Sequence, residues 1–413
     1  MATRVSRRND CRLCNSWDLE LVLPLAPTPI GDHYVPRDRL GEVQETYPLD
    51  LYLCHGCGHV QMLDTVDPEA LFGDYLYVTS SSPGLVEHFR KYADDLLDRL
   101  RPLPGSLVVE FGSNDGSLLR FFQAQGMRVL GVDPARAIAE RATQNGIETV
   151  PAFFTSGLAR QIRRERGPAA LITANNVFAH ADNLTDIADG IHDLLASDGV
   201  FCFEVSYLVD LMDNMVFDSI YHEHLCYHSV KPLDTFFRRH GLELIDAAHV
   251  GTKGGSLRCT VQLAGGPRPL TASVGRLIAL EAQRRLDQAD TFHVFAARID
   301  RAKQAVARAV HDLRRQGKMI AGFGASVTTT TLIYHFDLGD KLSYIVDDNS
   351  ARHNLYSPGH HIPVVGPQAM YEQKPASVVI LAWRYAEPIM KKHQAYREQG
   401  GQFIVPLPAL KVA

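Results

Sequence analysis

The chain has 413 residues, of which 46% are hydrophobic and 22% are charged, and its formal net charge is -5. This length predicts two or three domains, and the composition is that of a globular protein. The mildly acidic balance gives no electrostatic reason to expect nucleic acid or an anionic membrane as a partner.

Long apolar segments are missing from the sequence. No run of about 20 apolar residues predicts a membrane span, and no apolar run follows the basic first residues, as a secretory signal would require. We therefore expect a cytoplasmic protein, with no membrane partner, whose seven cysteines are thiols or metal ligands. Three of them, Cys202, Cys226 and Cys259, lie in strand-like contexts and should be small buried side chains.

The first part of the chain carries two CxxC pairs. They are Cys11/Cys14 and Cys54/Cys57. Each CxxC turn brings two thiolates to one metal ion, and two such turns complete a tetrahedral sulfur site for zinc. Because four cysteines leave no open coordination position, the zinc should be structural. We expect a small zinc-binding module over residues 1–75, in which His55 and His59 are exposed and do not bind the metal.

From residue 83 onward, helical and strand patterns follow one another. Apolar residues at helical spacing predict a helix over 83–100, and residues 107–206 alternate between strands and helices. This alternation is typical of a parallel sheet with helices on both faces. We predict that a Rossmann-like α/β domain of this kind occupies residues 76–265.

A second α/β unit closes the chain. Residues 270–316 form a long amphipathic pattern that predicts a helix packed on the domain surface. The stretch KMIAGFGA at 318–325 then begins a new strand, and LSYIVDD, SVVILAW and QFIVPLP supply three more. We predict a C-terminal Rossmann-like domain over residues 266–413.

The segment VVEFGSNDGSLL forms a turn between the first strand of the alternation and its helix. Its glycines allow a ligand to approach the backbone at the carboxyl edge of the sheet. The turn lacks the GxGxxG pattern that a pyrophosphate favours. An acidic residue ends the next strand, where it can hold ribose hydroxyls, so the pattern favours S-adenosylmethionine. The candidate cofactor residues are Glu110, Gly112, Asn114, Gly116, Asp133, Pro134 and Asn175.

The densest group of polar and aromatic residues is SIYHEHLCYHS at 219–229. Histidine accepts protons near pH 7, and a tyrosine hydroxyl can donate to an oxyanion. A metal site formed by His222, His224 and His228 is an alternative, although the segment has no helical face to fix it. Tyr77, in a hydroxyl-rich loop, and His180, after the fourth strand, could also reach the substrate.

In order and spacing, these motifs resemble the sugar C-methyltransferases, S-adenosylmethionine-dependent 3-C-methyltransferases of nucleotide-linked 4-keto-deoxysugars. The resemblance spans nearly the whole chain and includes both CxxC pairs, the tyrosine–serine loop, VEFGSNDGSLL, GVDP, NNVFAH, YHEH, GTKGGSLR, GFGAS and DDNSARHNLYSPGHHIPV. It implies a class I methyltransferase domain between a zinc module and a second Rossmann-like domain. It also implies two cofactors, S-adenosylmethionine and zinc, and a nucleotide-sugar substrate.

The same resemblance implies roles for individual residues. His224 would be the general base, and Tyr221 and Glu223 would line the sugar. Tyr77 and His180 would complete the pocket, while the cofactor would be held by Glu110, Gly112 and Asp133. One departure is Thr328, which stands where the family often has a lysine after its GxGA turn. That difference leaves the nucleotide and the sugar open.

Other functions remain as alternatives at this stage. The same fold could methylate oxygen or nitrogen. A nicotinamide-dependent oxidoreductase is suggested by the GFGAS turn followed by Asp347 and Asp348, and a zinc-dependent nucleic-acid-binding protein by the CxxC pairs. A chain of this size could act as a monomer or a weak homo-oligomer.

Overall fold

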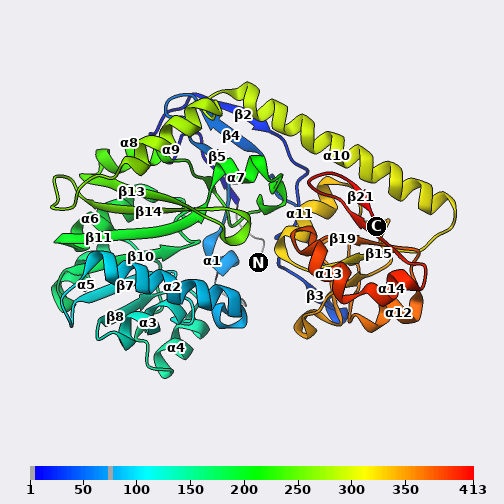
Figure 1. Cartoon of the computed structure of the whole chain (residues 1–413), viewed down its shortest axis with the longest axis horizontal. Helices are drawn as coiled ribbons and strands as arrows, with labels where there is room; N and C mark the ends of the chain where they lie inside the picture. The colour runs from blue at the N-terminus through cyan, green and yellow to red at the C-terminus, as the bar shows by residue number, and fades with distance from the viewer. Residues whose placement is uncertain (1–4, 73–77) are drawn as a thin grey trace.

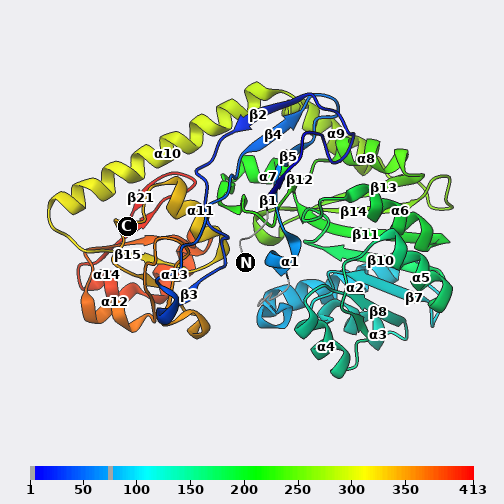
Figure 2. The same ribbon diagram turned by 180° about the vertical axis from the view of Figure 1, so that it is seen from behind.

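The computed structural model describes residues 5–72 and 78–413. Two lobes lie side by side, and the long helix α10 (Ala289–Arg315) begins above the region between them and runs along the C-terminal lobe (Figure 1). Strands β2 (Leu19–Leu23), β4 (Leu51–Cys54) and β5 (Val60–Met62) of the N-terminal module lie near the start of this helix, whereas β3 (Val35–Pro36) lies beside the C-terminal lobe, as the view from behind also shows (Figure 2).

The other helices are α1 (Pro68–Phe72), α2 (Pro83–Leu100), α3 (Ser117–Ala124), α4 (Arg136–Gln144), α5 (Ser156–Arg166), α6 (Leu184–Leu194), α7 (Leu208–Asp213), α8 (Val230–Arg239), α9 (Ala272–Gln283), α11 (Val327–His335), α12 (Gln368–Gln373), α13 (Ala386–Lys392) and α14 (Gln394–Glu398). The strands are β1 (Val5–Arg7), β2 (Leu19–Leu23), β3 (Val35–Pro36), β4 (Leu51–Cys54), β5 (Val60–Met62), β6 (Asp64–Val66), β7 (Leu107–Phe111), β8 (Arg128–Val132), β9 (Thr149–Val150), β10 (Ala169–Asn175), β11 (Leu195–Ser206), β12 (Cys226–Tyr227), β13 (Leu242–Val250), β14 (Ser256–Leu263), β15 (Ile320–Phe323), β16 (Ile345–Val346), β17 (Leu355–Tyr356), β18 (Val364–Val365), β19 (Ser377–Ile380), β20 (Gln402–Val405) and β21 (Lys411–Val412).

The first lobe is built on a seven-stranded sheet with the order β13-β14-β11-β10-β7-β8-β9. The five strands from β9 to β11 in this order run parallel, and only β14 is antiparallel to both of its neighbours. Every residue of β7 is buried, because helices cover both faces of a sheet of this kind. The predicted Rossmann-like class I methyltransferase fold is therefore confirmed. The carboxyl ends of its parallel strands all lie at one edge of the sheet, where ligands bind in such folds.

The second lobe contains a six-stranded sheet with the order β18-β16-β15-β19-β20-β21. All pairs are parallel except β20 with β21 at the edge. The GFGAS turn leads from β15 into α11, as expected for a second Rossmann-like unit. This agrees with the predicted C-terminal α/β domain.

Two strand pairs join segments that are far apart in the sequence. The N-terminal module forms an antiparallel sheet with the order β12-β5-β4-β2, in which β12 comes from the segment after YHEH. Strand β3 pairs with β17 of the second lobe. These two strand pairs connect parts of the chain on either side of residues 75 and 265. The domain limits expected at those two positions therefore remain a prediction.

Two local expectations were wrong. His59 was expected at the surface but is fully buried, because it lies at the start of the sheet that packs on the first lobe. The single helical pattern over 270–316 is two helices, α9 and α10. Arg285 between them has a φ of 54°, a left-handed conformation that interrupts a right-handed helix.

In the described ranges, none of the helices combines the length and apolar character needed to cross a lipid bilayer. Cys202, Cys226 and Cys259 are all buried, as their strand-like contexts predicted.

Candidate active site

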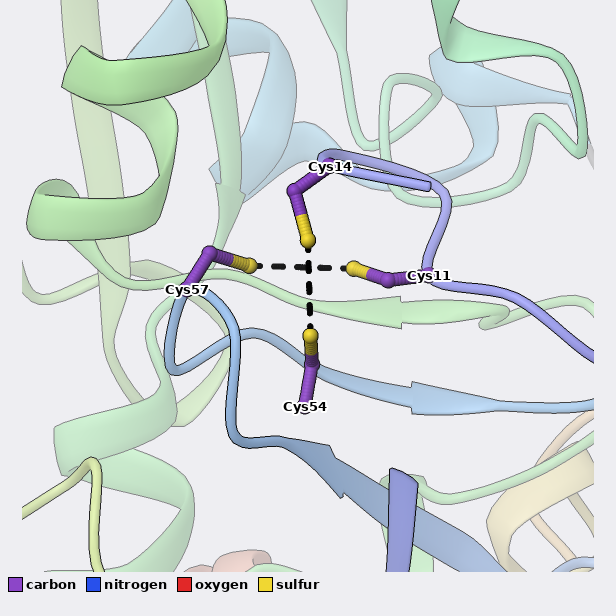
Figure 3. A group of neighbouring side chains, drawn as sticks. All are labelled: Cys11, Cys14, Cys54 and Cys57. Atoms are coloured by element: carbon purple, nitrogen blue, oxygen red, sulfur yellow. Dashed lines mark hydrogen bonds between the residues drawn. The ribbon is translucent and has the colours of Figure 1, made fainter. Parts of the chain in front are cut away.

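Four thiols meet where the two CxxC turns face each other. Cys11 and Cys14 come from one turn and Cys54 and Cys57 from the other, and all four point to a common centre (Figure 3). Their sulfur atoms lie within 4.8 Å of one another. Zinc–sulfur bonds of about 2.3 Å would place the sulfurs of a tetrahedral site about 3.8 Å apart. The Sγ–Sγ distances of 3.4 Å for Cys14–Cys54 and 3.7 Å for Cys11–Cys57 fit a closed structural zinc site.

A cavity of about 440 Å³ opens at the carboxyl edge of the seven-stranded sheet. Six of the seven predicted cofactor residues line it: Glu110, Gly112, Asn114, Asp133, Pro134 and Asn175. Gly116 does not line the cavity, but it caps the N-terminus of α3 with a φ of 74°. His180, Asp182 and Lys253 form another part of the wall.

The position of Gly112, beside this cavity, has no room for a side chain. Its φ is 66°, and a Cβ atom built on it would lie 2.2 Å from Cγ2 of Val177. A side chain here would therefore be strained and would displace the wall. The glycine therefore allows the turn after β7 and Val177 to pack closely at the cavity.

Carboxylates surround the cavity where the methyl donor would bind. Glu110, 2% exposed, accepts a hydrogen bond from Nδ2 of Asn175 at 3.3 Å through Oε1, while Oε2 has no partner in the described chain. Burial raises the pKa of Glu110 well above its usual value. Asp133 accepts from the backbone N–H of Asn114 at 2.8 Å and of Ala135 at 2.9 Å, which fixes its carboxylate at the end of β8.

These residues fit S-adenosylmethionine. The cofactor is cationic at sulfur and carries a ribose and an ammonium group, so it needs acidic acceptors inside an otherwise apolar cavity. Glu110 has an unused buried acceptor, and each oxygen of Asp133 has a second lone pair beyond its backbone bond.

Replacing Asp133 with asparagine should weaken S-adenosylmethionine binding about tenfold, the usual scale for losing one charge-assisted hydrogen bond. Isothermal titration calorimetry measures this directly. The amide can accept only one of the two backbone bonds, from Asn114 or from Ala135, so the melting temperature is measured as well, and an unchanged value would show that losing the other bond leaves the fold intact. An unchanged dissociation constant would remove Asp133 from the cofactor site.

The ring of His224 lies beside that of His180, with ring centroids 5.0 Å apart, and 4.0 Å from the ring of Tyr221. Because Nδ1 lies 2.7 Å from the carbonyl oxygen of Ser219, and a carbonyl can only accept, Nδ1 carries the proton. Nε2 is then an acceptor, and no side chain or backbone group of the described chain bonds to it. Burial lowers the pKa of His224 to about 4, so the ring is neutral at pH 7.

Glu223, the neighbour of this ring, is 8% exposed. Burial raises the pKa of Glu223 to about 7, and the carboxylate of Asp32 adds to the effect, while the cation of Lys253 opposes it. Asp32 is itself paired with Arg352 of the second lobe, at 2.6 Å. The segment 221–224 thus lies where the N-terminal module and both lobes meet.

The predicted site residues do not all lie together. His222 contacts Tyr47 and His228 stacks on His59, away from His224. In the described part of the chain, only the four cysteines form a group of three or more potential metal ligands, so the alternative three-histidine metal site is not formed. Tyr77 lies outside the described residues.

Comparisons with known proteins agree with this arrangement. Family models match for a zinc binding domain over residues 11–72, a methyltransferase domain over 85–247 and a C-methyltransferase C-terminal domain over 251–408. The chain is 33% identical to C-methyltransferase NovU from Streptomyces niveus over 405 residues, which cover 98% of this chain and 96% of that protein.

The chain belongs to the C-methyltransferase family. It is an S-adenosylmethionine-dependent C-methyltransferase with a zinc-binding domain, as the resemblance implied. The oxidoreductase and nucleic-acid-binding alternatives are therefore dropped.

Solved structures align with part of this C-methyltransferase. An S-adenosylmethionine-dependent methyltransferase from Clostridium acetobutylicum is 13% identical, covering 44% of this chain and 92% of its own, with a TM-score of 0.36. Magnesium protoporphyrin IX methyltransferase from Synechocystis is 16% identical, covering 47% and 90%, with a TM-score of 0.34. Scores this low carry no information about the substrate.

The sequence motifs of this C-methyltransferase did not single out Lys253. It lies in a 3₁₀ turn, η4 (Thr252–Gly254), with a φ of 51°, and lines the cavity with His180. It makes no ion pair with any described residue. Burial lowers its pKa, whereas the carboxylates of Glu204 and Glu223 raise it. Burial lowers the pKa of His180 and His224, and the charge of Lys253 adds to this effect. The available signal was the motif GTKGGSLR, in which this lysine stands between a threonine and two glycines and to which no role was assigned.

Proposed function

We propose that this enzyme methylates the carbon next to the ketone of a nucleotide-linked 4-keto-deoxysugar. The observation that carries the proposal is the neutral ring of His224, whose Nε2 has an unused lone pair beside the wall of the cofactor cavity. A carbon acid needs such a base, whereas an amine acceptor does not. The sugar and its nucleotide come from the sequence resemblance.

His224 accepts the proton from the carbon next to the ketone, through Nε2. The carbonyl oxygen of Ser219 holds Nδ1–H and stabilises the imidazolium that forms, because a hydrogen bond to the charged ring favours it. When bound, S-adenosylmethionine supplies the electrophilic methyl group that the resulting carbanion takes.

An oxyanion develops at the ketone oxygen as the proton leaves, and it needs a donor. His180 and Tyr221 are candidates from the sequence. Lys253 adds a full positive charge on the same wall as His180. Because its charge has no carboxylate within ion-pair distance in the described chain, it remains available for an anion of the substrate.

Glu223 should control the pH dependence. Its carboxyl group is mostly protonated below its pKa of about 7 and ionised above it, and the ionised form accepts hydrogen bonds from sugar hydroxyl or amino groups. We therefore expect kcat/KM to rise with pH through about 7. His224, with a pKa of about 4, stays neutral across this range. It therefore causes no change in kcat/KM near pH 7.

The pH profile of Glu223→Gln tests this assignment. The amide does not titrate, so the limb near pH 7 should disappear and kcat/KM should be flat between pH 6 and 8. A limb that persists unchanged in this variant would assign the titration to another group.

The reaction is tested by incubating the enzyme with isotope-labelled S-adenosylmethionine and a panel of nucleoside-diphosphate keto-sugars. Mass spectrometry should detect one added methyl group, and NMR should place it on a carbon next to the ketone. A methyl group on oxygen or nitrogen would replace this proposal with the alternative kind of methyl transfer, and no turnover of any keto-sugar would reject the substrate class.

A further inference from the structure

The loop that follows β10, residues 176–183, forms one wall of the cofactor cavity. Asn176, Val177, His180, Ala181, Asp182 and Asn183 all line the cavity. The loop contains the histidine that lies beside His224. Its conformation therefore determines both the shape of the cofactor site and the place of His180.

A buried arginine of the first CxxC turn holds this loop. Arg12 lies between Cys11 and Cys14, and its side chain is fully buried. Its Nη2 lies 2.9 Å from Oδ1 of Asp182, and its Nε donates to the same oxygen at 3.1 Å. Within the described ranges, Asp182 is the only carboxylate paired with Arg12, while Asp182 has a second, partly exposed partner in Arg8, whose Nη1 lies 3.3 Å from Oδ2.

The remaining donors of Arg12 are fixed inside the zinc-binding module. Its Nη1 donates to the carbonyl oxygen of Met62, and its Nη2 donates to Oγ1 of Thr65 at 2.8 Å. Thr65 also donates to Asp182, at 3.3 Å. The guanidinium is thus held on one side by the module and on the other by the cavity loop. A buried charge in such a position is sensitive to small displacements, because losing its partner leaves it unpaired.

Backbone bonds tie the same module to the segment that carries His224. The N–H of Met62 in β5 donates to the carbonyl of Leu225 at 2.9 Å, and the N–H of Cys226 donates to the carbonyl of Ala179 at 3.0 Å. These two hydrogen bonds therefore connect the module, through residues 225 and 226, to Ala179 in the cavity loop, the residue before His180.

We propose that the zinc-bound CxxC turn positions the cofactor loop through the Arg12–Asp182 pair, so that binding of zinc and of S-adenosylmethionine are coupled. Zinc fixes Cys11 and Cys14 and with them the residue between them. Without the metal the two cysteine side chains are released and only hydrogen bonds hold the turn, among them those from the N–H of Cys11 to Ser16 and from the N–H of Arg12 to Gln61, so the position of Arg12 relative to the loop is less fixed. Coupling of this kind is reciprocal, because each ligand changes the affinity of the other by the same factor. Arg12 acts as a positioning residue and does not line the cavity.

The first test uses the wild-type enzyme. Its apparent zinc affinity is measured by competition with a chelator, with and without saturating S-adenosylmethionine. We expect the cofactor to raise the zinc affinity about tenfold, within the usual range for allosteric coupling. Equal zinc affinities in the two conditions would overturn the proposal.

The second test is Arg12→Met, which keeps the four cysteines. We expect it to retain one zinc ion, to bind S-adenosylmethionine about tenfold more weakly by calorimetry, and to lose most of the coupling to zinc. Amide hydrogen exchange should speed up in residues 176–183. Wild-type affinity and exchange in this variant would contradict the proposal.

A matched control is Arg7→Met, which breaks an exposed ion pair with Asp64 in the same module and should leave S-adenosylmethionine affinity unchanged. Equal losses in both variants would indicate general destabilisation and count against a specific role for Arg12. If Arg12→Met does not fold, Asp182→Asn retains the shape and removes the charge, and it should reduce the same coupling. In the double variant the two effects should add only in part, since both variants lose the Arg12–Asp182 contact, while Asp182→Asn also loses the ion pair with Arg8.

Discussion

Replacing His224 with asparagine should lower kcat by about 10³-fold, within the range attributed to a positioned general base. Asparagine can keep the hydrogen bond to the carbonyl of Ser219, but its amide does not accept a proton at neutral pH. Binding of S-adenosylmethionine should stay within about threefold of wild type, because His224 contacts the cavity wall without lining it. Steady-state kinetics and calorimetry measure the two quantities separately.

Proton exchange gives an independent measure of the same step. In deuterium oxide, with S-adenosylhomocysteine in place of the methyl donor, wild-type enzyme should exchange the proton next to the ketone of the substrate, and His224→Asn should not. His311→Asn, an exposed histidine on α10, is the matched control and should behave as wild type. Turnover in His224→Asn near the wild-type rate would exclude this residue as the base.

Replacing Lys253 with methionine should lower kcat by about 10²-fold to 10³-fold, the cost of removing one donor to an oxyanion. Methionine has a similar length, so the wall of the cavity should keep its shape. KM should change little, because the charge acts mainly on an anion that exists only as the proton is removed. Lys253→Arg should recover part of the rate.

Chemical rescue distinguishes a charge effect from a structural one. Ethylammonium should raise the rate of a Lys253→Ala variant, in which the smaller side chain leaves space for a small cation. Lys341→Met is the matched control, since Lys341 pairs with Asp337 and Asp340 far from the cavity. A rise in KM with unchanged kcat would instead place Lys253 on an ionic group already present in the ground state of the substrate.

Most of the candidate cofactor residues that line the cavity could be predicted from the sequence, because they are close in the chain and follow consecutive parallel strands. Glu110 and Gly112 belong to one turn, and Asp133 ends the next strand of the sheet. Strands that run parallel bring such turns to one edge. The four cysteines of the candidate zinc site could be predicted equally well, since a CxxC turn positions two thiolates locally.

The residues that the motifs did not identify depend on long-range contacts. Arg12 and Asp182 are 170 residues apart, and no local pattern marks either one. Lys253 follows β13, which is an edge strand of the seven-stranded sheet. Its turn nevertheless reaches the cavity wall that carries His180. Within YHEH, the spacing alone could not tell which histidine faces the cavity. His222 and His224 differ in their surroundings, and those come from Tyr47 and Ser219.

The amino-acid sequence determined the fold class, the cluster of four cysteines and the glycine turn that lines the cavity, because each follows from local spacing and from alternating strands and helices. Only the tertiary structure decided which imidazole has a free nitrogen beside the cavity, that Lys253 joins its wall, and that the zinc-binding module holds the loop of His180. These properties depend on burial and on partners far away in the chain, and neither quantity is encoded in the spacing of neighbouring residues.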